Sequence, residues 1–518
     1  MIPRKDKGKE SIKMIKTKIH NPIMWADVPD VDVIRINDIY YMVSTSMHTM
    51  PGCPIMKSKD LAHWEIINYV FETLENTKAH NLEDEKGIYG QGSWAATLGF
   101  HKGFYYVCFA CNDRNCFYIY RSEDIEKGNW TRIAVINQIL HDPALIFQDD
   151  IPYIIYGGGD IKIVELKEDL TGLKEGGLHE ELLHTPAEGI GLRCEGGHAY
   201  NINGMYYLLY IEWPKDGHGR RREVCYRSDN LMGPYERKVI FDDDMGYHNK
   251  GIAQGAIFDT PEGNWYAMLF QDHDSVGRIP YILPIVWEDG WPVAGLEGKT
   301  PKDFYVPLEE TDVKTLVISD EFNEDKNKLA LNWQWNHNPD HTGWSLTHRP
   351  GFLRLTNKSI TKRGVLYARN TLTQRTEGPA CTGITRIELT GLRSMDCTGL
   401  LALQSNFGMV GIRKEEDGSK RVVMCINNGN NEEKEIETLP YFLDHIYFKI
   451  HFDFRDSRDI AVFYYSENGE VWHRIGQELH MKYTLDHFMG YRIGLFNYGT
   501  KNTEGYADFD YFHYEVEE

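Results

Sequence analysis

The segment NDIYYMVST at residues 37–45 decides the fold, because the chain repeats its polar turn, aromatic residues and apolar run four more times. The other copies are HKGFYYVCFA at 101–110, QDDIPYIIYGG at 148–158, NINGMYYLLYIE at 201–212 and PEGNWYAMLFQD at 261–272. Their first aromatic residues are Tyr40, Tyr105, Tyr153, Tyr206 and Trp265, so the intervals are 65, 48, 53 and 59 residues. Each copy predicts two strands joined by a tight turn.

A weaker echo follows several copies, as in SKDLAHW at 58–64 and SEDIEKGNW at 122–130, and predicts an outer hairpin of the same unit. Five four-stranded units of this length predict an all-β chain that begins with a five-bladed β-propeller. The 31 Tyr and 12 Trp agree with this, because aromatic side chains favour pleated, half-buried surfaces. The alternatives are a β-sandwich with coincidental tyrosine pairs and a protein-interaction propeller, although the repeat signature typical of interaction propellers is absent.

The composition limits the partners that the chain can bind. With 56 basic and 77 acidic residues the net charge is −21, which disfavours nucleic acid and leaves a neutral sugar unaffected. No apolar run reaches the roughly 18 residues of a membrane span, so we expect no membrane contact. The first twenty residues lack the apolar stretch of a signal peptide, which favours the cytoplasm. A chain missing its native leader would instead be secreted or periplasmic.

The nine cysteines have irregular spacing, which predicts free thiols in a reducing compartment. The alternative is a zinc site at Cys108, Cys111 and Cys116, for which the sequence offers no fourth ligand nearby.

The register of the repeats places a set of carboxylates at the centre of the ring. Ten or eleven residues before each first aromatic, on the strand that lines the channel, stand Asp30, Trp94, Asp142, Glu195 and Gln254. Three of the five are acids, and like charges in one funnel raise one another's pKa. A core has no use for such an arrangement, whereas an acid/base site does. The sequence therefore predicts an active site at this point, in preference to solvated surface acids.

Four segments, in order, resemble glycoside hydrolase family 43. They are NPIMWADVPDVDVIRINDIYYMVSTSMHTMPGCPIMKSKDLAHWE at 21–65, GSWAAT at 92–97, HDPALIF at 141–147 and CEGGHAY at 194–200. The resemblance extends over nearly the whole chain from Asn21 and is to the β-xylosidase and α-L-arabinofuranosidase type of that family. It implies an inverting enzyme in which Asp30 is the general base, Glu195 the general acid and Asp142 the residue that tunes pKa and orients.

Asp27 and Asp32 compete with Asp30 for the role of base. Strand alternation puts Asp30 and Asp32 on one face, so spacing does not separate them. The resemblance selects Asp30, with one departure at Val31, where the family commonly has proline.

Further residues are candidates for substrate contact. Trp94 offers an apolar face for a pentose, with a packed core tryptophan as the alternative. Arg278, at the end of QDHDSVGR, matches a family arginine near the terminal sugar and would offset the acids. Gln254 stands where many family members carry a channel histidine, which argues against a channel metal. The remaining candidates are the channel residue His273, which is equally well a structural histidine, and the pocket-wall residues Met47, His48, Tyr247 and His248.

The five-fold pattern ends near Leu296, and short alternating strands such as RVVMCIN at 421–427 and YFKIHFDF at 447–454 continue to the end. We therefore expect a polar extension at 1–20, a propeller at 21–296, a linker at 297–317 and a β-sandwich at 318–518. This last domain resembles the concanavalin A-like domain of β-xylosidase-type members. That likeness implies calcium bound by Glu321 and Asp510. Phe407 is a candidate wall residue if the sandwich closes one side of the propeller funnel.

These predictions converge on one activity. We expect an exo-glycosidase that removes terminal β-D-xylosyl or α-L-arabinofuranosyl residues from xylan- or arabinan-derived oligosaccharides. No cofactor is required for that chemistry, and the sandwich faces favour a homo-oligomer. The alternative is a non-catalytic glycan-binding propeller with a lectin-like sandwich.

Overall fold

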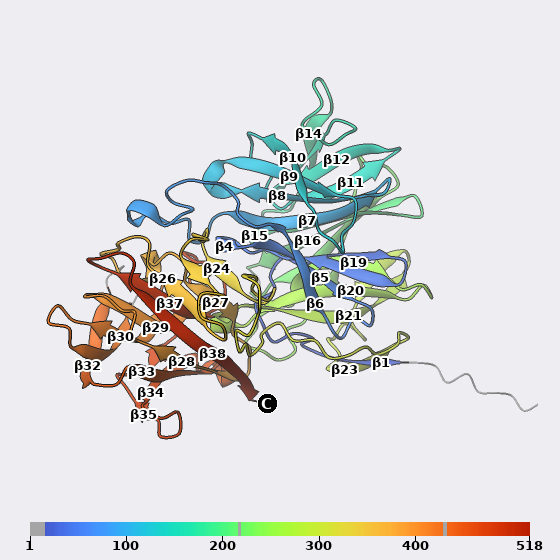
Figure 1. The fold of residues 1–518 in the computed structure, drawn as a ribbon. Helices are drawn as coiled ribbons and strands as arrows, with labels where there is room; N and C mark the ends of the chain where they lie inside the picture. Colours follow the sequence, from blue (N-terminus) through green and yellow to red (C-terminus); the bar gives the residue numbers. More distant parts are fainter. Residues whose placement is uncertain (1–15, 216–218, 428–432, 518) are drawn as a thin grey trace, which may run out of the picture.

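The five repeats fold into five antiparallel sheets arranged in a ring, followed by a second all-β part (Figure 1). The computed structural model describes residues 16–215, 219–427 and 433–517, so most of the predicted N-terminal extension, residues 1–15, lies outside the described ranges. The innermost strands of the sheets contact one another in the ring order β2, β7, β11, β15, β19 and back to β2. The predicted five-bladed propeller is confirmed.

Each blade adds its four strands in chain order from the channel outward. Blade one has β2 (Asp32–Ile36), β3 (Ile39–Val43), β5 (Gly52–Ser58) and β6 (Glu65–Phe71). Blade two has β7 (Ser93–His101), β8 (Phe104–Cys111), β9 (Cys116–Ser122) and β10 (Thr131–Ile136). Blade three has β11 (Ala144–Gln148), β12 (Ile151–Tyr156), β13 (Asp160–Glu165) and β14 (His179–His184). Blade four has β15 (Ile190–Ile202), β16 (Met205–Pro214), β17 (Arg222–Ser228) and β18 (Glu236–Phe241). Blade five has β19 (Ala253–Asp259), β20 (Trp265–Asp272), β21 (Arg278–Glu288) and β22 (Trp291–Ala294).

The first aromatic residue of every repeat lies on the second strand of its blade, as the repeat pattern predicts. These second strands are buried along most of their length, since blades pack against both of their faces. The outermost strands β10 and β14 alternate or remain exposed. A long apolar run followed by a polar turn is therefore what a middle strand of a blade requires.

A pair of short strands lies outside the five blades. β1 (Thr17–His20) pairs with β23 (Asp303–Val306), so residues that we assigned to a polar extension and to a linker are part of the fold. β1 buries Thr17 and Ile19 and exposes Lys18 and His20, an alternation too short to be recognised within a charged segment. The Asn21 side chain also accepts a hydrogen bond from the backbone N–H of Ile282 in blade five.

The second part is a sandwich of two sheets. Its first sheet contains β24 (Gln334–Asn336), β27 (Leu372–Arg375), β29 (Asp396–Leu403), β30 (Gly408–Lys414), β31 (Lys420–Ile426), β32 (Lys434–Tyr441) and β37 (Arg492–Gly499). Its second sheet contains β25 (Trp344–Ser345), β26 (Leu353–Thr356), β28 (Ala380–Glu388), β33 (His445–Asp453), β34 (Ile460–Ser466), β35 (His473–Arg474), β36 (Leu479–His480) and β38 (Tyr506–Glu517). The propeller contributes one edge strand to the first sheet, because β4 (Thr49–Met50) pairs with β24.

The only helical elements within the described ranges are short 3₁₀ turns: η1 (Glu83–Glu85), η2 (Asn112–Arg114), η3 (Asp274–Val276), η4 (Val365–Tyr367) and η5 (Arg455–Ser457). Among the described residues, no helix has the length and apolar character needed to cross a bilayer. All nine cysteines are free and buried, which confirms the prediction of unpaired thiols.

Candidate active site

A cavity of about 900 Å³ lies where the inner strands of the propeller begin. It brings together the five residues that share the register of the repeats: Asp30, Trp94, Asp142, Glu195 and Gln254. A segment of the sandwich, which supplies Tyr483, Leu485 and Phe488, forms one of its walls. The volume is within the range typical of small-molecule sites.

Three of the five register residues, at or near the start of their inner strands, have left-handed backbone. The φ angles are 52° at Asp30, 45° at Asp142 and 69° at Gln254. Gly196, which follows Glu195, has a φ of 67°, and a Cβ there would lie 2.6 Å from the Gln254 side chain. Non-glycine residues adopt this conformation at a cost in free energy, and such residues cluster at functional sites.

Asp30 is buried and held on both carboxylate oxygens. Arg278 Nη1 lies 2.9 Å from Oδ1 and 3.0 Å from Oδ2. Gln254 Nε2 donates to Oδ1 at 2.9 Å, and Thr45 Oγ1 donates to Oδ2 at 2.7 Å. Every one of these neighbours donates, so both oxygens of Asp30 act as acceptors. Asp30 in turn holds the pKa of Arg278 above its usual range, although burial acts to lower it.

Asp142, Glu195 and His141 form a second charged group. Asp142 Oδ2 accepts a hydrogen bond from the backbone N–H of Gly196 at 2.7 Å. His141 Nε2 lies 3.5 Å from Asp142 Oδ2 and 3.8 Å from Glu195 Oε2. Burial, together with the charges of Glu195 and Asp30, raises the pKa of Asp142 to about 6, against the attraction of His141. Burial acts to lower the pKa of His141, but Glu195, Asp142 and Asp30 outweigh it and raise that pKa to about 9.

Aromatic rings from both parts of the chain line the cavity. Trp94 stacks on Phe488 with ring centroids 5.4 Å apart, and Phe488 also covers the Arg278 guanidinium at 4.8 Å. Tyr483 lies edge-on to Phe488 at 6.1 Å. Trp213 of blade four is 41% exposed and completes the lining on the side of the mouth. Flat apolar faces beside hydrogen-bonding groups are what a sugar ring binds.

The structure separates the three aspartates that competed for the role of base. Asp30 precedes β2 in a left-handed turn, so strand alternation does not apply to it, and Asp32 faces a different cavity. Asp27 is engaged by backbone: it accepts hydrogen bonds from Arg278 N–H at 2.7 Å and from Gly490 N–H of the sandwich at 2.9 Å. Only Asp30 of the three lines the cavity that holds Asp142 and Glu195.

Several predicted contact residues do not line this cavity. Phe407 is 2% exposed and packs in the sandwich core, while the wall comes from 483–488 instead. His48 is fully buried at the junction of the two parts, against Tyr89, His337 and His487. Met47 packs beside it and pairs with Ser93. The loop that carries both continues into β4, which the sandwich covers.

His273 is also structural. Its Nε2 lies 2.8 Å from Gln271 Oε1 and 3.0 Å from the Tyr281 hydroxyl. The Tyr247 ring stacks on the His273 ring with centroids 4.0 Å apart, so Tyr247 packs against His273 and does not line the cavity. His248 in turn packs edge-on against Tyr247 at 4.7 Å.

The predicted calcium ligands each have a cationic or hydrogen-bonding neighbour. Glu321 Oε1 lies 2.6 Å from His513 Nε2, and Asp510 Oδ2 lies 2.7 Å from Arg386 Nη1. An arginine on one carboxylate disfavours a cation shared by this pair. Calcium at Glu321 and Asp510 stays a prediction. Within the described ranges, one group could hold a metal ion, namely His141, Asp142 and Glu195, with ligand atoms within 4.8 Å of one another.

The sequence did not identify His141, Thr45, Tyr483, Leu485 or Phe488 as part of the site. His141 directly precedes Asp142 in HDPALIF, which is a signal that could have been used. The sandwich residues lie in a loop between β36 and β37 with no repeat to place them.

The chain is similar to known proteins along its length. Residues 19–292 match the family described as Glycosyl hydrolases family 43, and residues 319–515 match Beta xylosidase C-terminal Concanavalin A-like domain. A Beta-xylosidase of Formosa agariphila is 28% identical over 556 residues, covering 96% of this chain and 90% of that protein. A Non-reducing end alpha-L-arabinofuranosidase of Bacteroides ovatus is 28% identical over 371 residues, covering 68% of this chain and 67% of that protein.

A solved structure described as Bifunctional GH43-CE from Bacteroides eggerthii is 42% identical, with a TM-score of 0.91. The match covers 97% of this chain and 64% of that one, so this chain spans just under two thirds of its length.

Proposed function

This chain belongs to glycosyl hydrolase family 43, and from this membership and the geometry of its cavity we propose that it is an inverting exo-glycosidase. Its substrates are oligosaccharides derived from xylan or arabinan, from which it releases terminal β-D-xylosyl or α-L-arabinofuranosyl residues. The observation that carries the proposal is the convergence of Asp30, Asp142 and Glu195 in one cavity walled by aromatic rings. Binding alone has no need of three carboxylates, since like charges gathered in one pocket cost free energy.

Asp30 is the general base of this proposal. Its three side-chain donors fix the orientation of the carboxylate that accepts a proton from the water attacking the anomeric carbon. Inversion requires the base and the acid on opposite faces of the sugar, with room for that water between them. Asp30 belongs to the group bound by Arg278, apart from the group of His141, Asp142 and Glu195, which agrees with two opposed carboxyl groups.

Glu195 is the general acid, and it protonates the glycosidic oxygen as the bond to the leaving sugar breaks. Its side chain is 31% exposed, in contrast to the buried Asp142, as expected of a group that must be protonated again from solvent after each turnover. Asp142 keeps a second carboxylate close to Glu195, with the ligand atoms of Asp142, Glu195 and His141 within 4.8 Å of one another. His141 balances the pair and limits the repulsion.

Exo action follows from the wall that the sandwich adds. Phe488 stacks on Trp94, and Arg278 Nη2 donates a hydrogen bond to the Phe488 carbonyl at 3.3 Å. These contacts hold the wall from the sandwich next to Asp30. A funnel closed at this side accepts the end of a chain and excludes a continuous polymer from crossing it. The sandwich therefore limits cleavage to the terminal sugar.

The test uses the purified full-length chain with 4-nitrophenyl β-D-xyloside and 4-nitrophenyl α-L-arabinofuranoside. We expect release of nitrophenol from at least one, loss of about 10³-fold or more in kcat for Asp30→Asn, and inverted anomeric configuration in the first product seen by proton NMR. Glu195→Gln should lose far more activity on xylobiose than on a nitrophenyl glycoside, because a good leaving group needs less protonation. Calorimetric binding of xylobiose without any turnover would instead identify a glycan-binding protein.

A further inference from the structure

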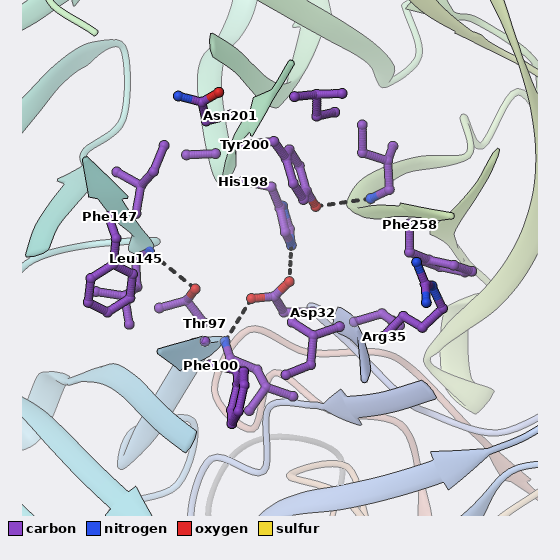
Figure 2. Close-up of a pocket in the computed structure, with 18 of the residues that line it drawn as sticks. Asp32, Arg35, Thr97, Phe100, Leu145, Phe147, His198, Tyr200, Asn201 and Phe258 are labelled. Carbon is purple, nitrogen blue, oxygen red and sulfur yellow. Dashed lines mark hydrogen bonds and ion pairs between the residues drawn. The ribbon is translucent and has the colours of Figure 1, made fainter. Parts of the chain in front are cut away.

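A second tier of polar side chains lies deeper in the channel and joins one blade to the next (Figure 2). Three side chains accept hydrogen bonds from the backbone N–H of a neighbouring inner strand. The bonds are Leu98 N–H to Asp32 Oδ2 at 2.7 Å, Leu145 N–H to Thr97 Oγ1 at 3.2 Å and Ile257 N–H to the Tyr200 hydroxyl at 3.0 Å. These residues line a cavity of about 450 Å³ that is distinct from the one holding the catalytic carboxylates.

His198 differs from the rest of this tier because it bonds to the segments that carry the base and the acid. Its Nε2 lies 3.2 Å from the carbonyl oxygen of Val31, the residue after Asp30. Its Nδ1 lies 3.3 Å from the carbonyl oxygen of Gly196, the residue after Glu195. The ring is 8% exposed, so water does not replace these partners readily.

The two partners and a carboxylate surround the ring. Carbonyl oxygens only accept, so each of the two bonds is made by an N–H of the ring. Asp32 lies on the Nε2 side, with Oδ1 3.6 Å from Nε2, and Figure 2 shows the ring directed at this carboxylate. Asp32 is itself fixed by the Leu98 N–H.

We propose that His198, paired with Asp32, is a positioning residue that fixes the segment of the general acid against the segment of the general base. The inference rests on the proposed function and adds to it a residue that never touches the substrate. It acts through the backbone: one ring sets the distance between Val31 and Gly196, and thereby between Asp30 and Glu195. Because inversion depends on that separation, a shift of about 1 Å lowers the rate by roughly 100-fold.

The first experiment replaces His198 with alanine and measures hydrolysis of whichever nitrophenyl glycoside the wild-type enzyme accepts. We expect kcat to fall by about 10- to 100-fold while KM changes by less than about three-fold, because the sugar contacts lie in the other cavity. The cavity beside His198 reaches the surface at Phe100, which is 42% exposed, so added imidazole has a path to the vacated position. Imidazole in the millimolar range should restore part of kcat in His198→Ala and leave the wild type unchanged.

Tyr200→Phe is the matched control. Tyr200 lies on the same strand, but its hydroxyl accepts a hydrogen bond from the Ile257 N–H of β19, whereas His198 bonds the carbonyls of Val31 and Gly196. This variant should lose stability without losing kcat. If His198→Ala fails to fold, Asp32→Asn replaces it, since the amide keeps an acceptor for Leu98 N–H while removing the charge beside His198; we expect a kcat reduction of about 5- to 50-fold.

The outcomes separate the two proposals. A wild-type enzyme that hydrolyses no glycoside overturns the proposed function itself. A wild-type enzyme that is active, with His198→Ala and Asp32→Asn retaining full kcat, overturns the positioning role alone. Equal losses of kcat in Tyr200→Phe and His198→Ala also overturn it, because they would show a general effect of loosening the channel.

Discussion

Replacing Asp142 with asparagine should abolish activity and yet stabilise the protein at neutral pH. Asp142 is buried, and its burial together with Glu195 and Asp30 raises its pKa from 3.8 to about 6. Its folded-state pKa therefore lies above its unfolded-state value, so the folded state binds the proton more tightly. The free energy of unfolding therefore falls as the pH rises from about 4 to about 6, and above pH 6 the whole cost of burying the ionised Asp142 is present.

The magnitude follows from the size of this difference. A pKa difference of about two corresponds to about 3 kcal/mol, which a neutral, isosteric asparagine avoids. The Gly196 N–H keeps its acceptor, because the amide oxygen of asparagine replaces Oδ2. For a domain of this size about 3 kcal/mol raises the melting temperature by roughly 6 °C.

Thermal unfolding of wild type and Asp142→Asn, measured from pH 4 to pH 8, checks this. The melting temperatures should coincide near pH 4 and diverge up to pH 6.5, with the variant higher. Asp303→Asn is the control with the opposite sign: hydrogen bonds and ion pairs with Lys18 and His20 lower the pKa of Asp303 to about 2, so its removal should not stabilise the protein at pH 7. A variant at position 142 that is no more stable at pH 7.5, or a difference that does not depend on pH, would refute the reasoning.

Three further predictions concern the surroundings of the site. Arg278→Met removes the ion-pair partner of the buried Asp30. This loss should lower the free energy of unfolding by about 3–5 kcal/mol and kcat by at least roughly 100-fold. Wild-type values in denaturant titration and in kinetics would contradict this. Phe488→Ala removes the ring that stacks on Trp94 and should reduce kcat/KM by about 5- to 30-fold, mainly through KM, whereas an unchanged KM would exclude sugar contact at this wall. Burial lowers the pKa of His48 to about 3, so the free energy of unfolding falls as the pH drops below 6.5. His48→Phe loses no hydrogen bond, because neither ring nitrogen of His48 has a partner. This variant should be about 2 kcal/mol more stable than wild type at pH 5 and equal to it at pH 7.5. Equal melting temperatures at both pH values would contradict the last of these.

The repeats made the propeller and its carboxylates predictable from sequence. A strand that recurs at similar intervals must occupy the same place in each blade, so residues in one register meet at the channel without any knowledge of their contacts. The register of the repeats does not distinguish Asp30 from Asp32. The difference arises from a left-handed turn at Asp30, which directs it into one cavity while Asp32, two residues on, faces another.

The contribution of the sandwich was not predictable in this way. Phe407 and Phe488 are both apolar residues in loops, and only the tertiary pairing decides which of them meets the propeller. The backbone N–H of Gly490 donates to Asp27, and the N–H of Tyr491 donates to the Ser275 carbonyl. These two hydrogen bonds hold the loop that contains Phe488 against the propeller cavity. His48 was misplaced for the same reason, since the strand that follows it is paired with β24 of the sandwich.

The surroundings of Asp30 show why the proposed base and the junction between the first and last blades depend on the same contacts. Thr45 comes from blade one, whereas Gln254 and Arg278 come from blade five, the last of the ring. The carboxylate is therefore bonded across the junction where the first and last blades meet. No strand exchange between blades one and five closes this ring within the described ranges; β1 and β23 pair outside the blades. A loss at Asp30 should accordingly loosen the junction as well as remove the proposed base, whereas a loss at Glu195, on the innermost strand β15 of blade four, should leave that junction intact.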